Sequence, residues 1–109
     1  MFVVANELVV DEQYRGQFES TFADSMRATL PGVPGLLRAS LLAPTSEGGH
    51  LATLEFEDED AYRAYIKSDA FRSAHPWPGR VPLISNALTT YTVHTDLTGD
   101  ALVAADQQE

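Results

Sequence analysis

The pattern of apolar positions along the chain predicts four strands, one long helix and a pair of short helices. Strands are expected where apolar residues run together or alternate, and helices where apolar residues recur every three or four positions. The strands are expected over 2–10, 36–43, 50–56 and 83–96, and the helices over 11–30, 61–66 and 68–75.

The first expected strand is apolar on both faces, which is typical of a strand at the centre of a sheet or covered on both sides. Asn6 interrupts one of these faces, between Val4 and Leu8. A buried amide without a hydrogen-bond partner costs about 1–3 kcal/mol, so Asn6 needs a partner. Two interpretations are open: a bond to backbone or to a buried water, or a polar group directed into a pocket.

An aromatic stripe marks the long helix, because Tyr14, Phe18, Phe22 and Met26 recur at a spacing of four. Side chains at this spacing are usually core residues. The prolines and glycines of 31–35 are expected to end this helix and turn the chain.

The second and third strands are separated by a glycine-rich loop over 44–49, which favours an antiparallel hairpin. His50 lies at the loop end of the third strand, and we predict a solvated side chain there. His94 is expected near the exposed end of the last strand. The acidic run 58–60 is interpreted as a helix cap rather than a metal site, because it is contiguous and has no histidine nearby.

The short helix at 68–75 ends in a histidine. Ser68 can cap its first turn, Asp69 places a negative charge at the positive end of the helix dipole, and Pro76 is expected to end the helix at or near His75. A histidine in this place either gains from the helix dipole when protonated or offers a neutral ring nitrogen to a metal.

The order of elements predicts an α+β fold, a ferredoxin-like β-α-β-β-α-β arrangement with an antiparallel sheet and helices on one face. Helices can cover only one face of such a sheet, whereas the first strand is apolar on both. We therefore predict a homodimer formed through the open sheet face.

Composition narrows the classes of function. The chain of 109 residues has no cysteine, which excludes disulfides and thiolate chemistry, and its net charge of −9 with scattered arginines argues against nucleic acid as a partner.

The first ten residues resemble neither a signal peptide nor a membrane span, so we expect a cytoplasmic protein that does not bind membranes. One domain is expected over 1–97, followed by a flexible acidic tail over 98–109.

Several motifs together resemble those of a known family. They are M-F-V-V-A-N at 1–6, P-G-L-L at 34–37, F-E-D-E-D-A-Y at 56–62, K-S-D-A-F-R-S-A-H at 67–75 and P-L-I-S-N-A at 82–87. The chain resembles the antibiotic biosynthesis monooxygenase (ABM) superfamily over nearly all of its length to about residue 97, and within it most of all the Isd-type haem-degrading monooxygenases.

This resemblance implies a dimeric α/β barrel that binds one haem per subunit, with haem as both substrate and cofactor. It implies that the ring is opened with O2 and an external reductant whose identity is unknown, and that iron is released. Carried over by motif, Asn6 and His75 are catalytic residues, and His75 is also the axial ligand of the haem iron. Tyr65, a third candidate catalytic residue, stands where the family has a tryptophan, and Ser25 stands where relatives have a basic residue.

The cofactor-binding residues expected besides Asn6 and His75 are Phe22, Met26 and Phe71, which suit the porphyrin faces, and Arg72, with Lys67 and Arg80 as further partners for the propionates. Trp77 lies just past the histidine and is not part of the family pattern. Two alternatives remain open: a cofactor-independent ABM monooxygenase that oxidises a small aromatic or quinol substrate, and a haem or small-ligand carrier without turnover.

Overall fold

A computed structural model of the chain describes residues 1–74 and 81–106, the last three by their backbone alone. Its elements follow the order predicted from the sequence. They are β1 (Phe2–Val10), the 3₁₀ turn η1 (Glu12–Tyr14), α1 (Arg15–Thr29), β2 (Leu36–Leu42), β3 (His50–Phe56), α2 (Glu59–Ile66), α3 (Asp69–Ala74), β4 (Leu83–Thr92) and α4 (Gly99–Asp106).

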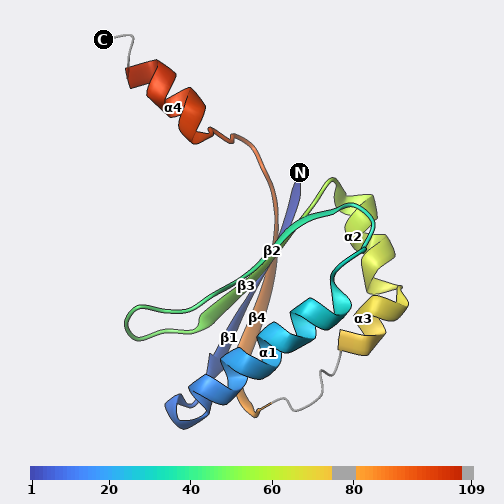
Figure 1. Cartoon of the computed structure of the whole chain (residues 1–109), viewed down its shortest axis with the longest axis vertical. Coiled ribbons are helices and arrows are strands. Elements are labelled where there is room, and N and C mark those ends of the chain that lie inside the picture. Colours follow the sequence, from blue (N-terminus) through green and yellow to red (C-terminus); the bar gives the residue numbers. More distant parts are fainter. Residues whose placement is uncertain (75–80, 107–109) are drawn as a thin grey trace.

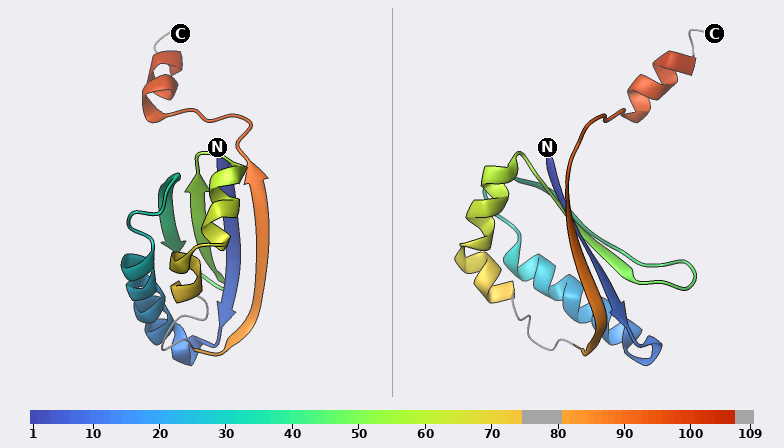
Figure 2. Two further views of the ribbon diagram at one scale, coloured as in Figure 1. Left: turned by 90° about the vertical axis from the view of Figure 1, so that its right-hand side faces the viewer. Right: turned by 180° about the vertical axis from the view of Figure 1, so that it is seen from behind.

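The four strands form one antiparallel sheet in the order β2-β3-β1-β4. Helices α1, α2 and α3 lie on one face of this sheet, and the opposite face is open (Figures 1 and 2). The predicted ferredoxin-like α+β fold is therefore confirmed, and the sheet is not closed into a barrel within the described chain. The homodimer and the dimeric barrel remain predictions.

The local signals for the helices act as expected. Asp58 accepts a hydrogen bond from the backbone N–H of Ala61 at 2.8 Å and caps α2, while the Ser68 hydroxyl accepts one from the N–H of Phe71 at 3.2 Å and caps α3. Between α1 and β2 the chain turns through Gly35, whose φ of 77° places it in the left-handed region, and a Cβ there would meet Ala61.

Two separate clusters of side chains join the helices to the sheet. The first is centred on Val4, Phe56 and Tyr65, and brings α2 and α3 against β1 and β3. The second is centred on Leu8, Phe18 and Val81, and brings α1 against the other end of β1. Phe18 and Phe56 are completely buried. The aromatic stripe of α1 therefore faces the sheet, as its spacing predicted.

His50 corrects one prediction. Its side chain is only 2% exposed, not solvated, because Phe18 and Glu19 of α1 pack against it. The ring packs edge-on against Phe18, with 4.9 Å between ring centroids, and Nε2 donates a hydrogen bond to Oε2 of Glu19 at 2.7 Å. Arg15 binds the same carboxylate at 3.2 Å and also donates to the carbonyl of Pro44 at 2.9 Å. This network ties α1 to the β2–β3 hairpin.

The C-terminal part of the chain differs from the prediction in its details. Strand β4 ends at Thr92 rather than near residue 96, and the segment predicted to be a tail contains helix α4, which lies away from the sheet (Figure 2). Leu102 and Val103 of this helix are about half exposed. The division at residue 97 remains a prediction. Among the described residues, no helix is both long enough and apolar enough to span a membrane.

The Glu19–His50 contact gives a test of how α1 is held. Glu19→Ala leaves the buried imidazole N–H without its acceptor, so we expect the free energy of unfolding to fall by about 1–3 kcal/mol. Gln17→Ala, at an exposed position on the same helix, should cost much less. Chemical denaturation of both variants checks this, and equal losses would show that the contact does not hold α1.

The same contact predicts a pH dependence. The hydrogen bond from His50 lowers the pKa of Glu19 below its ordinary value of 4.5, Arg15 acts in the same direction, and burial opposes both. A carboxyl group with a lowered folded-state pKa stabilises the fold above its unfolded-state pKa, and this contribution disappears as the pH falls through the folded value. The stability difference between wild type and Glu19→Ala should therefore be complete above pH 4.5 and shrink below it.

Candidate functional site

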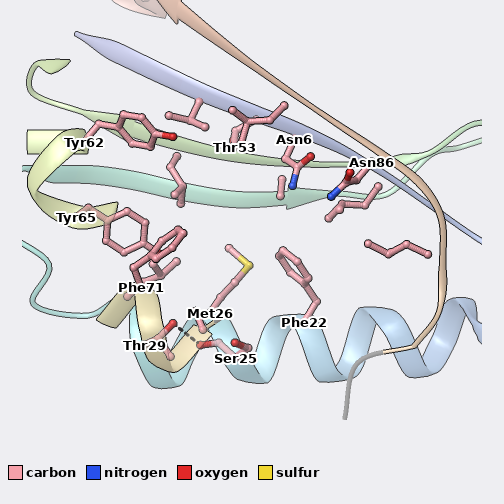
Figure 3. A pocket seen from close by; sticks show the side chains of 18 residues that line it. Asn6, Phe22, Ser25, Met26, Thr29, Thr53, Tyr62, Tyr65, Phe71 and Asn86 are labelled. Atoms are coloured by element: carbon pink, nitrogen blue, oxygen red, sulfur yellow. Dashed lines mark hydrogen bonds between the residues drawn. The ribbon is translucent and has the colours of Figure 1, made fainter. Parts of the chain in front are cut away.

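A cavity of about 250 Å³ lies between the helical layer and the sheet. Figure 3 shows its two walls, with the sheet on one side and α1 with the α2–α3 pair on the other. The described part of its lining contains no charged side chain. It consists of Val4, Asn6, Leu8, Phe22, Ser25, Met26, Thr29, Leu30, Ala52, Thr53, Leu54, Tyr62, Tyr65, Phe71, Ala74, Leu83, Asn86 and Leu88.

The cavity lies between the two clusters that hold the fold together. Val4 and Tyr65 of the first cluster and Leu8 of the second all contribute to its lining. Lining residues of β4 are exposed, with Leu83 at 38% and Leu88 at 57%, so the cavity opens toward this edge strand. Such an apolar cavity with a few polar groups is typical of a small-molecule site.

Asn6 lies on the sheet wall of the cavity. Strand β1 pairs with strands on both sides, and this places Asn6 opposite Ala52 of β3 and Leu88 of β4. Its side-chain oxygen Oδ1 is buried and has no hydrogen-bond partner among the described residues. Asn6 therefore faces a pocket, and a hydrogen bond from the backbone or side chains of the described residues is ruled out for this oxygen, which leaves a buried water or a ligand as its partner.

Tyr65 lies at the inner end of the same cavity and is 5% exposed. Its ring packs edge-on against Phe71, with centroids 5.5 Å apart, and lies tilted against Phe56, with centroids 5.7 Å apart. Burial raises the pKa of Tyr65, and the neighbouring Tyr62 adds to the rise. The phenol is therefore protonated at neutral pH, where it can donate a proton or a hydrogen bond but cannot act as a base.

The structure brings together most of the predicted binding residues. Phe22, Met26 and Phe71 all line the cavity with Asn6 and Tyr65 (Figure 3).

Arg72 does not line the cavity. It lies on the exposed side of α3, where it donates to Asp69 at 2.6 Å and to the carbonyl of Lys67 at 3.1 Å. Lys67 is also exposed and outside the lining.

His75, Trp77 and Arg80 lie outside the described residues. The residue before His75 in sequence, Ala74, ends α3 and is 7% exposed in the cavity wall.

Asn86 and Thr29 are polar lining residues that were not expected from the sequence, whereas Ser25 occupies the position where relatives have a basic residue. Asn86 lies on the sheet wall beside Asn6, while Ser25 and Thr29 lie on α1, where the Thr29 hydroxyl donates to the carbonyl of Ser25 at 2.8 Å (Figure 3). Asn86 could have been noticed because asparagine is unfavourable within a strand, and here it follows L-I-S in the apolar half of β4.

The fold and this cavity agree with a comparison against known families. The family model for antibiotic biosynthesis monooxygenase matches residues 1–77, so the chain belongs to this family. Membership of this family supports a monooxygenase, and hence an oxidoreductase, activity for the chain in general terms. No curated protein sequence matches the chain significantly.

Solved structures with the same fold include proteins of two kinds. A mutant of MhuD, with two manganese protoporphyrin IX molecules bound per active site, has 25% sequence identity and a TM-score of 0.77, and the match covers 91% of this chain and 100% of that one. The haem-degrader MhuD from Mycobacterium tuberculosis, with two haems in its active site, has 21% identity and a TM-score of 0.76, over 90% and 100% of the chains.

The second kind acts without a cofactor. A mutant of SnoaB, a cofactor-independent oxygenase from Streptomyces nogalater, has 22% identity and a TM-score of 0.66, and the match covers 88% of this chain and 94% of that one. The fold is therefore compatible with both kinds of chemistry.

The unpaired oxygen of Asn6 predicts that an apolar side chain at this position stabilises the protein. Asn6→Leu replaces a buried unsatisfied amide with an apolar side chain of similar size, so we expect the free energy of unfolding to rise by about 1 kcal/mol. Asn6→Ala removes the same amide without restoring contacts, and should bring no such gain. Thermal and chemical denaturation check this. A less stable Asn6→Leu protein would show that the amide is satisfied in solution.

Proposed function

We propose that this chain is a haem-degrading monooxygenase, which binds haem in the cavity, opens the porphyrin ring with O2 and an external reductant, and releases iron. The observation that supports this most strongly is that the two walls of the cavity carry different groups, Asn6 on the sheet and the end of α3 on the helical side. A flat apolar ligand would have the Asn6 amide on one side and the end of α3, directly before His75, on the other.

The lining suits the body of a porphyrin. Phe22, Met26 and Phe71 supply apolar and aromatic surface, and water is poorly accommodated among such side chains. Haem is larger than the enclosed space, and its propionates would be costly to bury in a lining whose described part carries no charge. We therefore propose that the ring enters through the open side along β4 and that the propionates remain in solvent.

Each residue has a separate role in this proposal. His75 would hold the haem iron through its neutral imidazole. Asn6 would offer an amide N–H to the bound ligand. Tyr65, held protonated by its burial, closes the inner end of the cavity and limits how far the ring enters. Haem itself, when bound, supplies the redox-active iron and the ring that is opened.

A haemin titration tests the binding step. Wild-type protein should give a shifted Soret band that saturates with stoichiometric haemin, and His75→Ala should lose this shifted band because the axial nitrogen is gone. His94→Ala is the matched control, since His94 is exposed and bonded to Thr95. If His75→Ala and wild type bind haemin equally, the proposed axial ligand is wrong.

Turnover is tested separately from binding. With ascorbate, air and catalase present, the Soret band of the haem-loaded protein should decay and an open-chain product should appear. A complex that stays unchanged under these conditions would identify a carrier instead of an enzyme. Tyr65→Trp restores the residue typical of the family, and we expect it to accelerate the decay.

A second candidate function is the cofactor-independent oxidation of a small neutral aromatic or quinol. The size of the cavity and its uncharged described lining favour this candidate. In this case Asn6 would stabilise an oxyanion, and His75 would serve as the base, since the neutral Tyr65 phenol can only act as an acid. Oxygen uptake with a quinol by protein shown to be free of haem would support this function over the first.

A further inference from the structure

Asn86 lies in a defined position relative to Asn6. In the antiparallel pair β1–β4, Asn6 is opposite Leu88 and Leu8 is opposite Asn86. These four residues form a two-by-two block on one face of the sheet, with the amides on one diagonal and the leucines on the other. All four line the cavity.

The spacing allows both amides to reach the same bound atom. Diagonal neighbours on antiparallel strands have Cβ atoms about 7–8 Å apart, and each carboxamide extends from its Cβ into the space between. Figure 3 shows the two amide groups next to each other on the sheet wall, both directed toward the cavity.

The described residues leave polar atoms of both amides without a partner. Oδ1 of Asn6 has no hydrogen-bond partner, and the Asn86 side chain makes no hydrogen bond among the described residues either. Asn86 is exposed, so its amide is open to solvent and to a ligand, whereas the Asn6 oxygen is buried. The nitrogen atoms of both amides face the cavity, so their N–H groups can donate to a ligand that lies there (Figure 3).

The residues around the two amides indicate which kind of ligand atom would bind to them. The described lining has no charged residue, so negative charge that develops on a bound oxygen could be stabilised there only by dipoles. Amide N–H groups are suitable donors for this purpose, and they act more strongly in an apolar cavity than in water. The open side of the cavity at β4 gives the oxygen access to Asn86.

We propose that Asn86 and Asn6 together form a two-amide site, which binds one ligand oxygen, or another small acceptor, that carries negative charge. Asn86 is thus a second donor in the cavity. This inference deepens the proposed function, and its first test rests on that function because it uses the haem-loaded protein.

Fluoride is the probe for the first test, because it is a compact anion that binds ferric haem and accepts hydrogen bonds. One lost hydrogen bond is worth about 1 kcal/mol, so Asn86→Ala should weaken fluoride binding to the haem-loaded protein about fivefold. Asn86→Gln, which retains the amide, should recover part of this loss. Ser85→Ala is the matched control, since Ser85 is the neighbouring residue of β4 and pairs with Val9 on the open face.

The outcomes separate this inference from the proposed function. Equal fluoride affinities for haem-loaded wild type and Asn86→Ala would overturn the two-amide site and leave haem binding intact. Failure of wild type to bind haemin would overturn the proposed function instead. The two-amide site is then tested on the haem-free protein with 1-hydroxyanthraquinone, a flat phenol whose colour reports its ionisation.

In this second test the amide pair should favour the phenolate form of the bound dye. We expect Asn86→Ala to weaken phenolate binding about fivefold relative to wild type. Ser85→Ala should again have no effect. If wild type binds the phenolate no better than Asn86→Ala, or does not bind the dye at all, the inference is wrong.

Discussion

The cavity exists because the helices are held against the sheet at two separate places and not along their whole length. One cluster, around Phe56 and Tyr65, fixes α2 and α3, and the other, around Phe18 and Leu8, fixes α1. Each cluster packs as a normal core. The side chains between them are too few or too small to fill the remaining space, so the position of the site follows from where the fold is stabilised.

This arrangement explains why the site can contain unsatisfied groups. A buried oxygen without a hydrogen-bond partner costs stability, and the contacts of Phe18, Phe56 and the Glu19–His50 pair stabilise the fold elsewhere. Phe18, Phe56 and the Glu19–His50 pair stabilise the fold outside the cavity lining, whereas Val4, Leu8 and Tyr65 belong both to the clusters and to the lining. The described lining presents apolar surface and amide or hydroxyl dipoles and no charged side chain, although the whole chain carries a net charge of −9. A ligand with a flat apolar body suits such a site whether or not it contains a metal.

Much of the fold and part of the site could be predicted from the sequence. The strands and helices follow from apolar periodicity, and the caps at Asp58 and Ser68 follow from residue type. Asn6 was noticeable because a polar residue interrupts an apolar strand face.

The positions of His50 and Asn86 were not predicted because they depend on contacts between elements that are distant in sequence. His50 is buried because Phe18 and Glu19 of α1 pack against it, and the local sequence around His50 carries no sign of that contact. Asn86 joins the site through the register of β4 on β1. Arg72, proposed from its proximity in sequence to His75, instead belongs to the outer side of α3.

The central claim is that a flat apolar ligand binds between the sheet wall and α1. It is tested most directly by nuclear magnetic resonance with gallium protoporphyrin IX, a diamagnetic analogue of haem. The side-chain amide signals of Asn6 and the methyl signal of Met26 should both shift on addition of this probe, while signals of the open sheet face, such as Tyr91, should not. Shifts confined to the open face, or no shift at Asn6 and Met26 with the porphyrin bound, would contradict the account.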